Sequence, residues 1–270
     1  MRAEASRMQG DALDVAVLQQ LLATPTFGRT LHILPQTAST NDEVKRLAAH
    51  GAPEGTVVIA AQQTHGRGRH GRSFVSPLGG IYLSLLLRPR LQAQCLPQLT
   101  LLVAVAAAEA ITEVSALPVR LKWPNDIEIH GKKVAGILVE AVIHAGLPAA
   151  VIVGIGINVN TTLEQFPQEL QARVTSLSLA AGRPFARSQL IATLLTHLER
   201  LYCTFQEVGT APIRQRWLHY GAIAGRALRF VQDGRSHLAA GVGLDEDGAL
   251  VVRLVDGTPQ RIIAGDVDFL

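Results

Sequence analysis

Cysteine is scarce in this sequence of 270 residues, which contains only Cys95 and Cys203. Two isolated cysteines exclude a disulfide-rich secreted scaffold and the paired ligands of a structural zinc site. Long apolar runs are also missing, because the longest uninterrupted one, residues 101–108, is far shorter than the roughly 18 residues of a membrane span. The first residues include Glu4 and Asp11 and lack the apolar segment of a secretory signal. These absences predict a protein of the reducing cytoplasm without a membrane span.

Charge of either sign is modest, with a formal net charge of +3 and a sequence pI of about 9.1. This excess favours an anionic ligand but is too small for a nucleic-acid-binding stripe. The phosphate loop GxxxxGK[ST] does not occur, so an ATP site would belong to another architecture. Tandem repeats and low-complexity tracts are absent as well.

Glycine and arginine, by contrast, are concentrated in residues 63–72, whose sequence is QTHGRGRHGR. Glycine permits close backbone approach, and arginine offers forked donors that suit carboxylates and phosphates. The embedded spacing GxGxxG is a weak signal for a dinucleotide site, and it lacks here both a following helix and an acidic residue about 20 positions on. The stretch therefore predicts a loop that binds a ligand carrying carboxylate and phosphate groups.

The apolar patterning predicts an α+β fold in which a mixed β-sheet is packed against helices. Strands are expected at residues 31–34, 56–62, 81–87, 119–123, 126–130, 133–144 and 149–160, and helices at 13–22, 41–50, 97–114, 187–206 and 212–220. Short strands separated by turns follow residue 222 and predict a small β-barrel. We therefore expect a catalytic domain at residues 1–222 and a barrel at residues 223–270.

Two local patterns leave their role open at this point. Residues 39–41, with the sequence STN, precede a predicted helix, and helix capping alone is the simpler interpretation of them. Gly136, Gly154 and Gly156 lie inside predicted strands, which glycine weakens unless a ligand or a backbone approaches closely. These three glycines therefore indicate a close approach of some kind.

Five motifs occur in one order along the chain: STN at 39–41, QTHGRGRHGR at 63–72, KWPNDI at 122–127, GKKVAGIL at 131–138 and GIGINVN at 154–160. Together with Gly265-Asp266-Val267, this set resembles the biotin protein ligases, over both their catalytic core and their C-terminal barrel. The resemblance implies a fold like that of class II aminoacyl-tRNA synthetases and biotin synthetase, with a small C-terminal SH3-like β-barrel. It also implies an ATP-dependent enzyme that makes biotinyl-5′-adenylate and transfers biotin to a lysine of a biotin carboxyl carrier protein.

The resemblance also implies a role for each matching residue. Biotin would be bound by Ser39, Thr40, Asn41, Gln63, Arg67, Gly68, Arg69, Lys133 and Gly136. ATP and the adenylate would be bound by Arg69, Arg72, Phe74, Lys122, Asn125, Asp126, Lys133 and Asn158. Lys133, Arg67 and Arg69 would be catalytic, because cations are needed where a carboxylate attacks a phosphate. Asp126 would hold Mg²⁺ beside the phosphates.

The chain departs from the family pattern in two places. Phe74 stands where the family usually has tryptophan, and an aromatic ring there is expected to stack on adenine. Fewer than 40 residues precede Ser39, so we expect a monofunctional ligase without an N-terminal DNA-binding domain and without a DNA partner. A homodimer is compatible with the resemblance.

Two other functions remain open. A lipoate or octanoyl ligase would share the fold, although the complete motif at residues 66–72 argues against it. A non-catalytic module that binds biotin or nucleic acid is the alternative from a different class.

Overall fold

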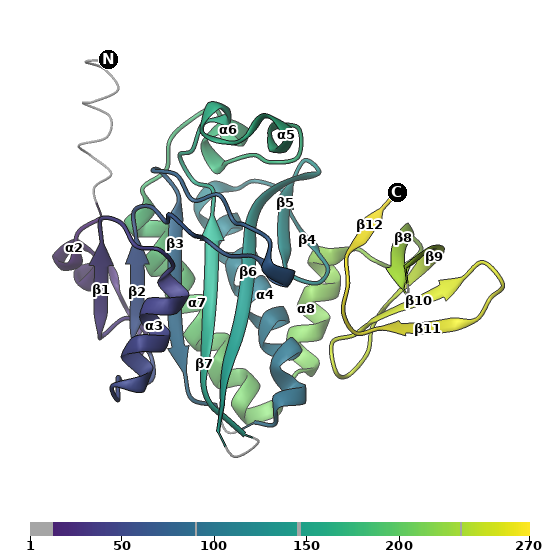
Figure 1. Cartoon of the computed structure of the whole chain (residues 1–270), viewed down its shortest axis with the longest axis horizontal. Helices are drawn as coiled ribbons and strands as arrows, with labels where there is room; N and C mark the ends of the chain where they lie inside the picture. Colours follow the sequence, from purple (N-terminus) through teal and green to yellow (C-terminus); the bar gives the residue numbers. More distant parts are fainter. Residues whose placement is uncertain (1–12, 90, 145–146, 233) are drawn as a thin grey trace.

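Two β-sheets organise the chain in a computed structural model that describes residues 13–89, 91–144, 147–232 and 234–270 (Figure 1). The strands of the first sheet are β1 (Leu31–Leu34), β2 (Val57–Ala60), β3 (Ile81–Leu87), β4 (Val119–Lys122), β5 (Asp126–Ile129), β6 (Lys132–His144) and β7 (Leu147–Ile157). Those of the second are β8 (Ala227–Gln232), β9 (Arg235–Leu244), β10 (Leu250–Leu254), β11 (Pro259–Ile262) and β12 (Val267–Phe269).

The first sheet is mixed and has the strand order β1-β2-β3-β7-β6-β5-β4. Strands β1 and β2 are parallel, and every other neighbouring pair is antiparallel. The second sheet is antiparallel, in the order β11-β10-β9-β8-β12. The predicted α+β class with a mixed sheet is therefore confirmed, and β12 is a strand that the apolar pattern did not predict.

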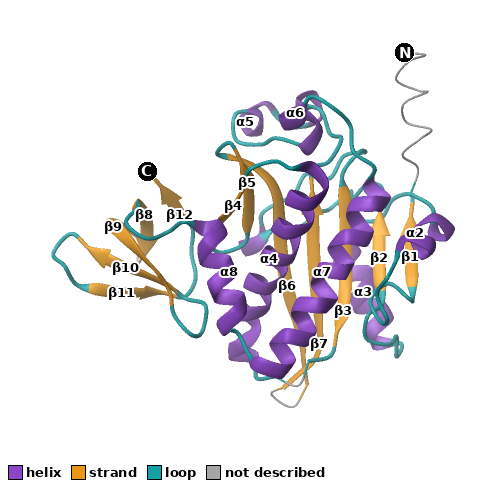
Figure 2. Cartoon of the chain, turned by 180° about the vertical axis from the view of Figure 1, so that it is seen from behind, coloured by secondary structure: helices purple, strands orange, loops and turns teal. Residues whose placement is uncertain are grey.

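The helices are α2 (Val15–Leu21), α3 (Thr40–Ala49), α4 (Leu96–Ser115), α5 (Gln168–Gln171), α6 (Leu177–Ala181), α7 (Arg187–Val208) and α8 (Ala211–Gly221). Helices α4, α7 and α8 cover one face of the first sheet (Figure 2), and α3 lies on the opposite face (Figure 1). The five longer helices fall close to the predicted ranges. The short helices α5 and α6 were not predicted, because four or five residues carry too little periodicity to be recognised.

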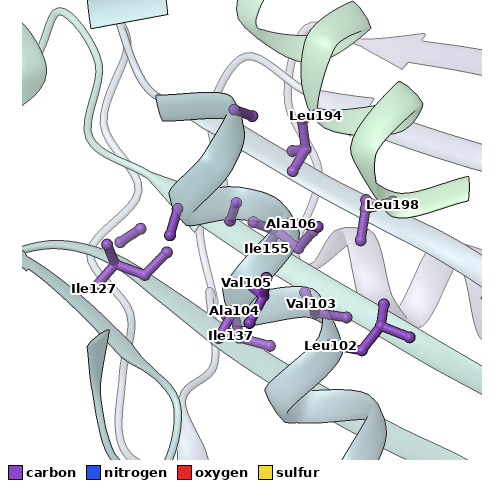
Figure 3. Close-up of a cluster of buried hydrophobic side chains, with 14 of the residues drawn as sticks. Leu102, Val103, Ala104, Val105, Ala106, Ile127, Ile137, Ile155, Leu194 and Leu198 are labelled. Carbon is purple, nitrogen blue, oxygen red and sulfur yellow. The ribbon is translucent and has the colours of Figure 1, made fainter. Parts of the chain in front are cut away.

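Helix α4 is apolar nearly all round because it is enclosed in the core. Its residues pack between the sheet and α7, as the close-up of Leu102, Ala106, Ile155 and Leu194 shows (Figure 3). By length and composition alone α4 would suffice to cross a membrane, although no uninterrupted apolar run reaches that length. Since 67% of its most apolar window is buried inside the protein, α4 is explained as a core helix.

The register of β6 and β7 brings the strand glycines together on the face that carries α3. Gly136 of β6 pairs with Gly156 of β7. Gly154, two residues before Gly156 and on the same face of β7, pairs with Leu138. On the other side of β7, Gly156 pairs with Tyr82 and Gly154 with Ser84 of β3. This arrangement leaves a strip of bare backbone in the middle of the sheet, which is the floor of the site described next.

Candidate active site

A pocket opens over the glycine strip, between the first turn of α3 and the loop of residues 63–74. It is lined by Ser39, Thr40, Asn41, Gln63, Arg67, Gly68, Arg69, Arg72, Ser73, Phe74, Asn125, Asp126, Lys133, Gly136, Ile137, Leu138, Gly154, Ile155, Gly156 and Asp266. Its empty volume is about 780 Å³ including the open mouth, which is in the range of small-molecule sites. Of the fifteen sequence-predicted residues, all except Lys122 and Asn158 line it.

The polar end of the pocket lies at the first turn of α3. Gln63 Oε1 accepts hydrogen bonds from the Thr40 backbone N–H (2.9 Å) and hydroxyl (3.1 Å), and Gln63 Nε2 donates to Ser76 Oγ (2.9 Å). Ser84 Oγ lies 2.7 Å from Thr40 Oγ1 and 2.6 Å from Asn41 Oδ1. Thr40 and Asn41 are buried, so these side chains form a fixed polar network.

Capping alone is therefore the wrong interpretation of residues 39–41. Ser39 is the N-cap residue of α3, but its side chain makes no capping hydrogen bond. Thr40 and Asn41 bond to residues of β3 and the loop instead of to the helix backbone. The sequence pattern is ambiguous here because the same residue types serve both purposes.

The glycine-arginine loop runs along the other side of the pocket. Gly66 must be glycine, since a Cβ there would lie 2.3 Å from the Phe74 carbonyl oxygen, and Gly71 has a φ of +71°. The turn is closed by hydrogen bonds from the Gly68 N–H to the Arg72 carbonyl (2.7 Å) and from the Phe74 N–H to the Gly66 carbonyl (2.8 Å). The glycines thus let the backbone fold back on itself, and the arginines project from it.

Each arginine of the loop meets an oxygen from a different part of the fold. Arg67 pairs with Asp42 of α3, Arg72 pairs with Asp266 just before β12, and Arg69 Nη1 lies 3.3 Å from Asn125 Oδ1. Burial lowers the pKa of Arg69, with the Arg72 charge acting in the same direction and Asp266 and Asp126 opposing them. The loop is held in place by these contacts.

Lys133 and Asp126 form an ion pair beside the loop, with Nζ and Oδ1 separated by 2.7 Å. Both side chains are half-buried and line the pocket. They come from neighbouring antiparallel strands, β6 and β5, and Asp126 pairs with Gly136 in the register. Together with Arg67 and Arg69, Lys133 makes this part of the pocket rich in cationic donors, which suits a carboxylate or a phosphate.

Phe74 packs against the glycine floor. A Cβ at Gly156 would be 2.4 Å from its ring, and one at Gly136 would be 3.1 Å from it. The ring centroid lies 5.8 Å from Lys133 Nζ and 6.4 Å from the ring centroid of Tyr82. Gly136 and Gly156 therefore make room for an aromatic ring, which is the close approach that glycines inside these strands indicated.

Lys122 and Asn158 do not line the pocket, so the structure does not bring them to the predicted site. Lys122 Nζ lies 3.3 Å from Asp268 Oδ1 and 3.9 Å from Glu128 Oε1, at the border with the second sheet. Asn158 is buried and donates to the Thr175 carbonyl (3.0 Å). Its Oδ1 is buried without a hydrogen-bond partner among the residues that the structure describes.

Several residues of the site have no role in the sequence-based prediction. The pocket lining includes Ser73, Ile137, Leu138, Ile155 and Asp266, and the polar network includes Ser84 and Glu140. Leu138 and Glu140 were detectable in principle, because they follow Gly136 at the strand period of two. Ser84 was not, since it lies within an otherwise apolar strand and its partners depend on the pairing of distant strands.

A bound Mg²⁺ would find a sparse set of ligands here. Among the described residues, no group of three or more His, Cys, Asp or Glu is placed to hold a metal ion. The two carboxylates of the pocket, Asp126 and Asp266, each face a cationic side chain. This fits an ion that takes most of its ligands from substrate phosphates and water and one from the protein.

Two parts of the chain match models of known protein families. Residues 33–158 match the model of the Biotin/lipoate A/B protein ligase family, and residues 225–270 match that of the Biotin protein ligase C terminal domain. The chain is 38% identical over 248 residues to the bifunctional ligase/repressor BirA of Bacillus subtilis, covering 92% of this chain and 76% of that relative. It is 34% identical to the biotin–[acetyl-CoA-carboxylase] ligase of Paracoccus denitrificans, covering 88% and 99%.

Among solved structures, the biotin protein ligase of Aquifex aeolicus in complex with biotin and ATP superimposes with a TM-score of 0.77. The identity is 30%, and the match covers 90% of this chain and 99% of that one. The fold, the ordered motifs and these relatives agree with one another, and this chain belongs to the biotin protein ligase family.

Proposed function

We propose that this protein is an ATP-dependent biotin protein ligase, which activates biotin as biotinyl-5′-adenylate and transfers it to a lysine of a biotin carboxyl carrier protein. The observation that carries the proposal is the pocket itself. It has a fixed polar network at one end and Lys133, Arg67 and Arg69 toward the other, over a floor of bare backbone. A ligand with a polar head group and a carboxylate matches this arrangement.

The polar end would hold the head group of biotin. Ser39, Thr40, Asn41 and Gln63 line this end, and Gly136 lies farther along the same floor, beside Lys133. Because the network fixes the orientation of each donor and acceptor before the ligand arrives, less side-chain entropy is lost on binding. We assign biotin recognition to these residues together with Gly68 of the loop.

The cationic part would bring the biotin carboxylate and the α-phosphate of ATP together. Two anions repel one another on approach, so fixed cations aimed at the developing charge lower the barrier. We assign this role to Lys133, Arg67 and Arg69. The attacking carboxylate oxygen forms a bond to phosphorus and pyrophosphate leaves, which gives the mixed anhydride that the acceptor lysine later attacks.

The nucleotide would extend along Arg72, Phe74, Asn125 and Asp126, which line the pocket. Lys122 and Asn158 do not line the pocket, so a role in nucleotide binding requires that they contact the nucleotide from outside it. Asn158 Oδ1, for which no hydrogen-bond partner is found in the described part of the chain, supports a contact with a donor such as the adenine amino group. Asp126 is the residue that would hold Mg²⁺, an ion that neutralises phosphate charge when bound.

The finer architecture is part of the same proposal. We take residues 1–222 as the catalytic domain, related in fold to class II aminoacyl-tRNA synthetases, and residues 223–270 as an SH3-like barrel. The five-stranded sheet of residues 227–269 supports the second assignment. A cytoplasmic location is supported by the two cysteines, both of which are free thiols. A homodimer stays a prediction.

One assay tests the function. The purified protein is incubated with ATP, Mg²⁺ and a carrier domain, with biotin or lipoate as the acid, and modification of the carrier is read by avidin blot and by mass. We expect pyrophosphate release that depends on biotin, and a mass increase on one carrier lysine. Labelling by lipoate without labelling by biotin would instead identify the related lipoate ligase activity.

A further inference from the structure

Glu140 lies just outside the pocket on the strand that forms its floor. Along β6, Gly136, Leu138 and Glu140 follow one another at every second position, and the first two line the pocket. Glu140 pairs with Ile152 of β7, which belongs to the small apolar cluster under α3. The Glu140 carboxylate is therefore on the α3 side of the sheet, at the polar end of the pocket, with 26% of its side chain exposed.

The carboxylate of Glu140 fixes the carboxamide of Asn41. Asn41 Nδ2 donates to Glu140 Oε2 at 2.6 Å, and Asn41 Oδ1 lies 2.6 Å from the Ser84 hydroxyl. A carboxylate only accepts hydrogen bonds, so it selects the orientation in which the amide NH₂ faces β6. The opposite side is closed by bare backbone, since a Cβ at Gly154 would lie 2.3 Å from Asn41 Oδ1.

Two cations share the same carboxylate. Lys45 Nζ lies 2.7 Å from Glu140 Oε1, and Arg67 Nη2 lies 3.8 Å from Glu140 Oε2. Burial by itself would raise the pKa of the Glu140 carboxyl, but the hydrogen bonds from Lys45 and Asn41 and the charges of Lys45 and Arg67 outweigh it and hold that pKa below its usual value. Glu140 thus connects an amide and an arginine that both line the pocket.

We propose that Glu140 is a positioning residue for biotin binding, which orients the Asn41 carboxamide at the polar end of the pocket. This inference rests on the proposed function, because biotin is the ligand of that end. It concerns recognition of the acid and not the chemistry at phosphorus, since Lys133 and Asp126 lie at the other part of the pocket. Glu140 therefore affects the affinity for biotin far more than the affinity for ATP.

The test is the steady-state kinetics of adenylation by Glu140→Gln. A glutamine keeps the shape but has one acceptor oxygen and an NH₂ group, so it cannot accept from both Asn41 and Lys45. Loss of one charge-assisted hydrogen bond predicts a rise of about tenfold or more in the KM for biotin. The KM for ATP and the kcat at saturating biotin should stay within about threefold of wild type.

Glu199→Gln is the matched control. Glu199 is a buried carboxylate on α7 and does not line the pocket. It accepts hydrogen bonds from the backbone N–H groups of Thr26 (2.9 Å) and Phe27 (3.5 Å). Its substitution should lower the Tm without changing either KM. If Glu140→Gln lowered the Tm but left the KM for biotin within about twofold of wild type, as expected for Glu199→Gln, the positioning role would be refuted.

A double-mutant comparison tests whether Glu140 acts through Asn41. With Asn41→Ala already in place, Glu140→Gln should raise the KM for biotin by much less than it does in the wild type, because neighbouring residues of one network are not additive. If Glu140→Gln raised the KM for biotin by the same factor with and without Asn41→Ala, Glu140 would not act through Asn41. An inactive wild type would refute the proposed function itself, which keeps that failure separate from a failure of the role of Glu140.

Discussion

Lys133 is held between an acidic and an aromatic side chain. Its ammonium group is 2.7 Å from the Asp126 carboxylate and 5.8 Å from the ring centroid of Phe74. When a carboxylate and a phosphate enter the pocket, they compete with Asp126 for this cation. The ion pair holds the Lys133 side chain at the pocket before the ligand arrives.

Lys133→Ala should therefore lose most of its adenylation activity. Removing one preorganised donor at developing charge commonly costs on the order of 100- to 1,000-fold in rate. Single-turnover formation of biotinyl-adenylate at saturating biotin and ATP measures this loss. Lys132→Ala is the neighbouring control, because Lys132 is exposed and does not line the pocket. Equal rates for the two variants would show that the assignment of Lys133 is wrong.

Phe74 and Gly156 offer a second test at the residue scale, because each leaves room for the other. A methyl group at Gly156 would meet the Phe74 ring at 2.4 Å. Gly156→Ala should destabilise the protein by about 1–3 kcal/mol, the usual cost of overpacking. In a Phe74→Ala background the same change should cost less than half as much. Chemical denaturation of the four proteins measures both values, and equal costs in the two backgrounds would contradict the contact.

Phe74 also has a predicted role toward the nucleotide. If its ring leaves the floor and stacks on adenine when ATP binds, Phe74→Ala should speed the dissociation of biotinyl-adenylate while leaving the affinity for biotin alone nearly unchanged. Aromatic stacking contributes about 0.5–1.5 kcal/mol, which corresponds to a change of roughly two- to tenfold. Stopped-flow dissociation of the adenylate measures it. An unchanged rate would favour simple packing of Phe74 against β6 and β7.

At the scale of elements, strands with a clear apolar pattern were the easiest to predict. Strand β3 has the predicted bounds, and α4 and α7 lie within two residues of theirs. The contacts of the site were harder, because Glu140 meets Asn41 only through the pairing of β6 with β7 and the packing of α3 on the sheet. Register and helix docking depend on the whole fold, so a local pattern cannot show which side chains meet.

The contacts that Asn41 and Lys45 of α3 make with Glu140 of β6 contribute to stability in a pH-dependent way. The pKa of Glu140 is depressed in the folded protein, so its contacts with Asn41 and Lys45 stabilise the fold at pH values above the unfolded pKa of about 4.3. This stabilisation is lost as the pH falls through the lower folded pKa. The difference in free energy of unfolding between wild type and Glu140→Gln should therefore be largest at pH 6–7 and shrink toward pH 3. A difference that grows on acidification would have the wrong sign.

At the scale of the whole molecule, the second sheet is joined to the first at the border of the site. Trp123 is buried and donates from Nε1 to the Gly248 carbonyl (3.2 Å), and Lys122 pairs with Asp268 (3.3 Å). A third contact reaches the pocket, since Asp266 lines the pocket and pairs with Arg72 of the glycine-arginine loop. The sequence motifs predicted that residues 265–267 belong to the family pattern, but not that Asp266 meets a loop almost 200 positions earlier.

Asp266 should restrain the loop when the site is empty. The loop is rich in glycine and carries three arginines, so its order depends on partners such as Asp42, Asn125 and Asp266. Removing one of them lowers the free energy of local opening and raises amide exchange there. Asp266→Ala should therefore speed hydrogen exchange of residues 66–72 by severalfold in the absence of ligand. Biotin with ATP should restore protection, because the ligand anions replace the lost carboxylate as partners of the arginines.

Asp268→Ala separates this effect from a general loosening of the second sheet. Asp268 lies two residues away and pairs with Lys122, but it does not line the pocket. Both substitutions remove a carboxylate from the same short strand region, so both should weaken the contact between the sheets. Only Asp266→Ala should change exchange in residues 66–72. If the two variants had the same effect on these residues, the loop would be responding to the position of the whole second sheet and not to the Arg72–Asp266 pair.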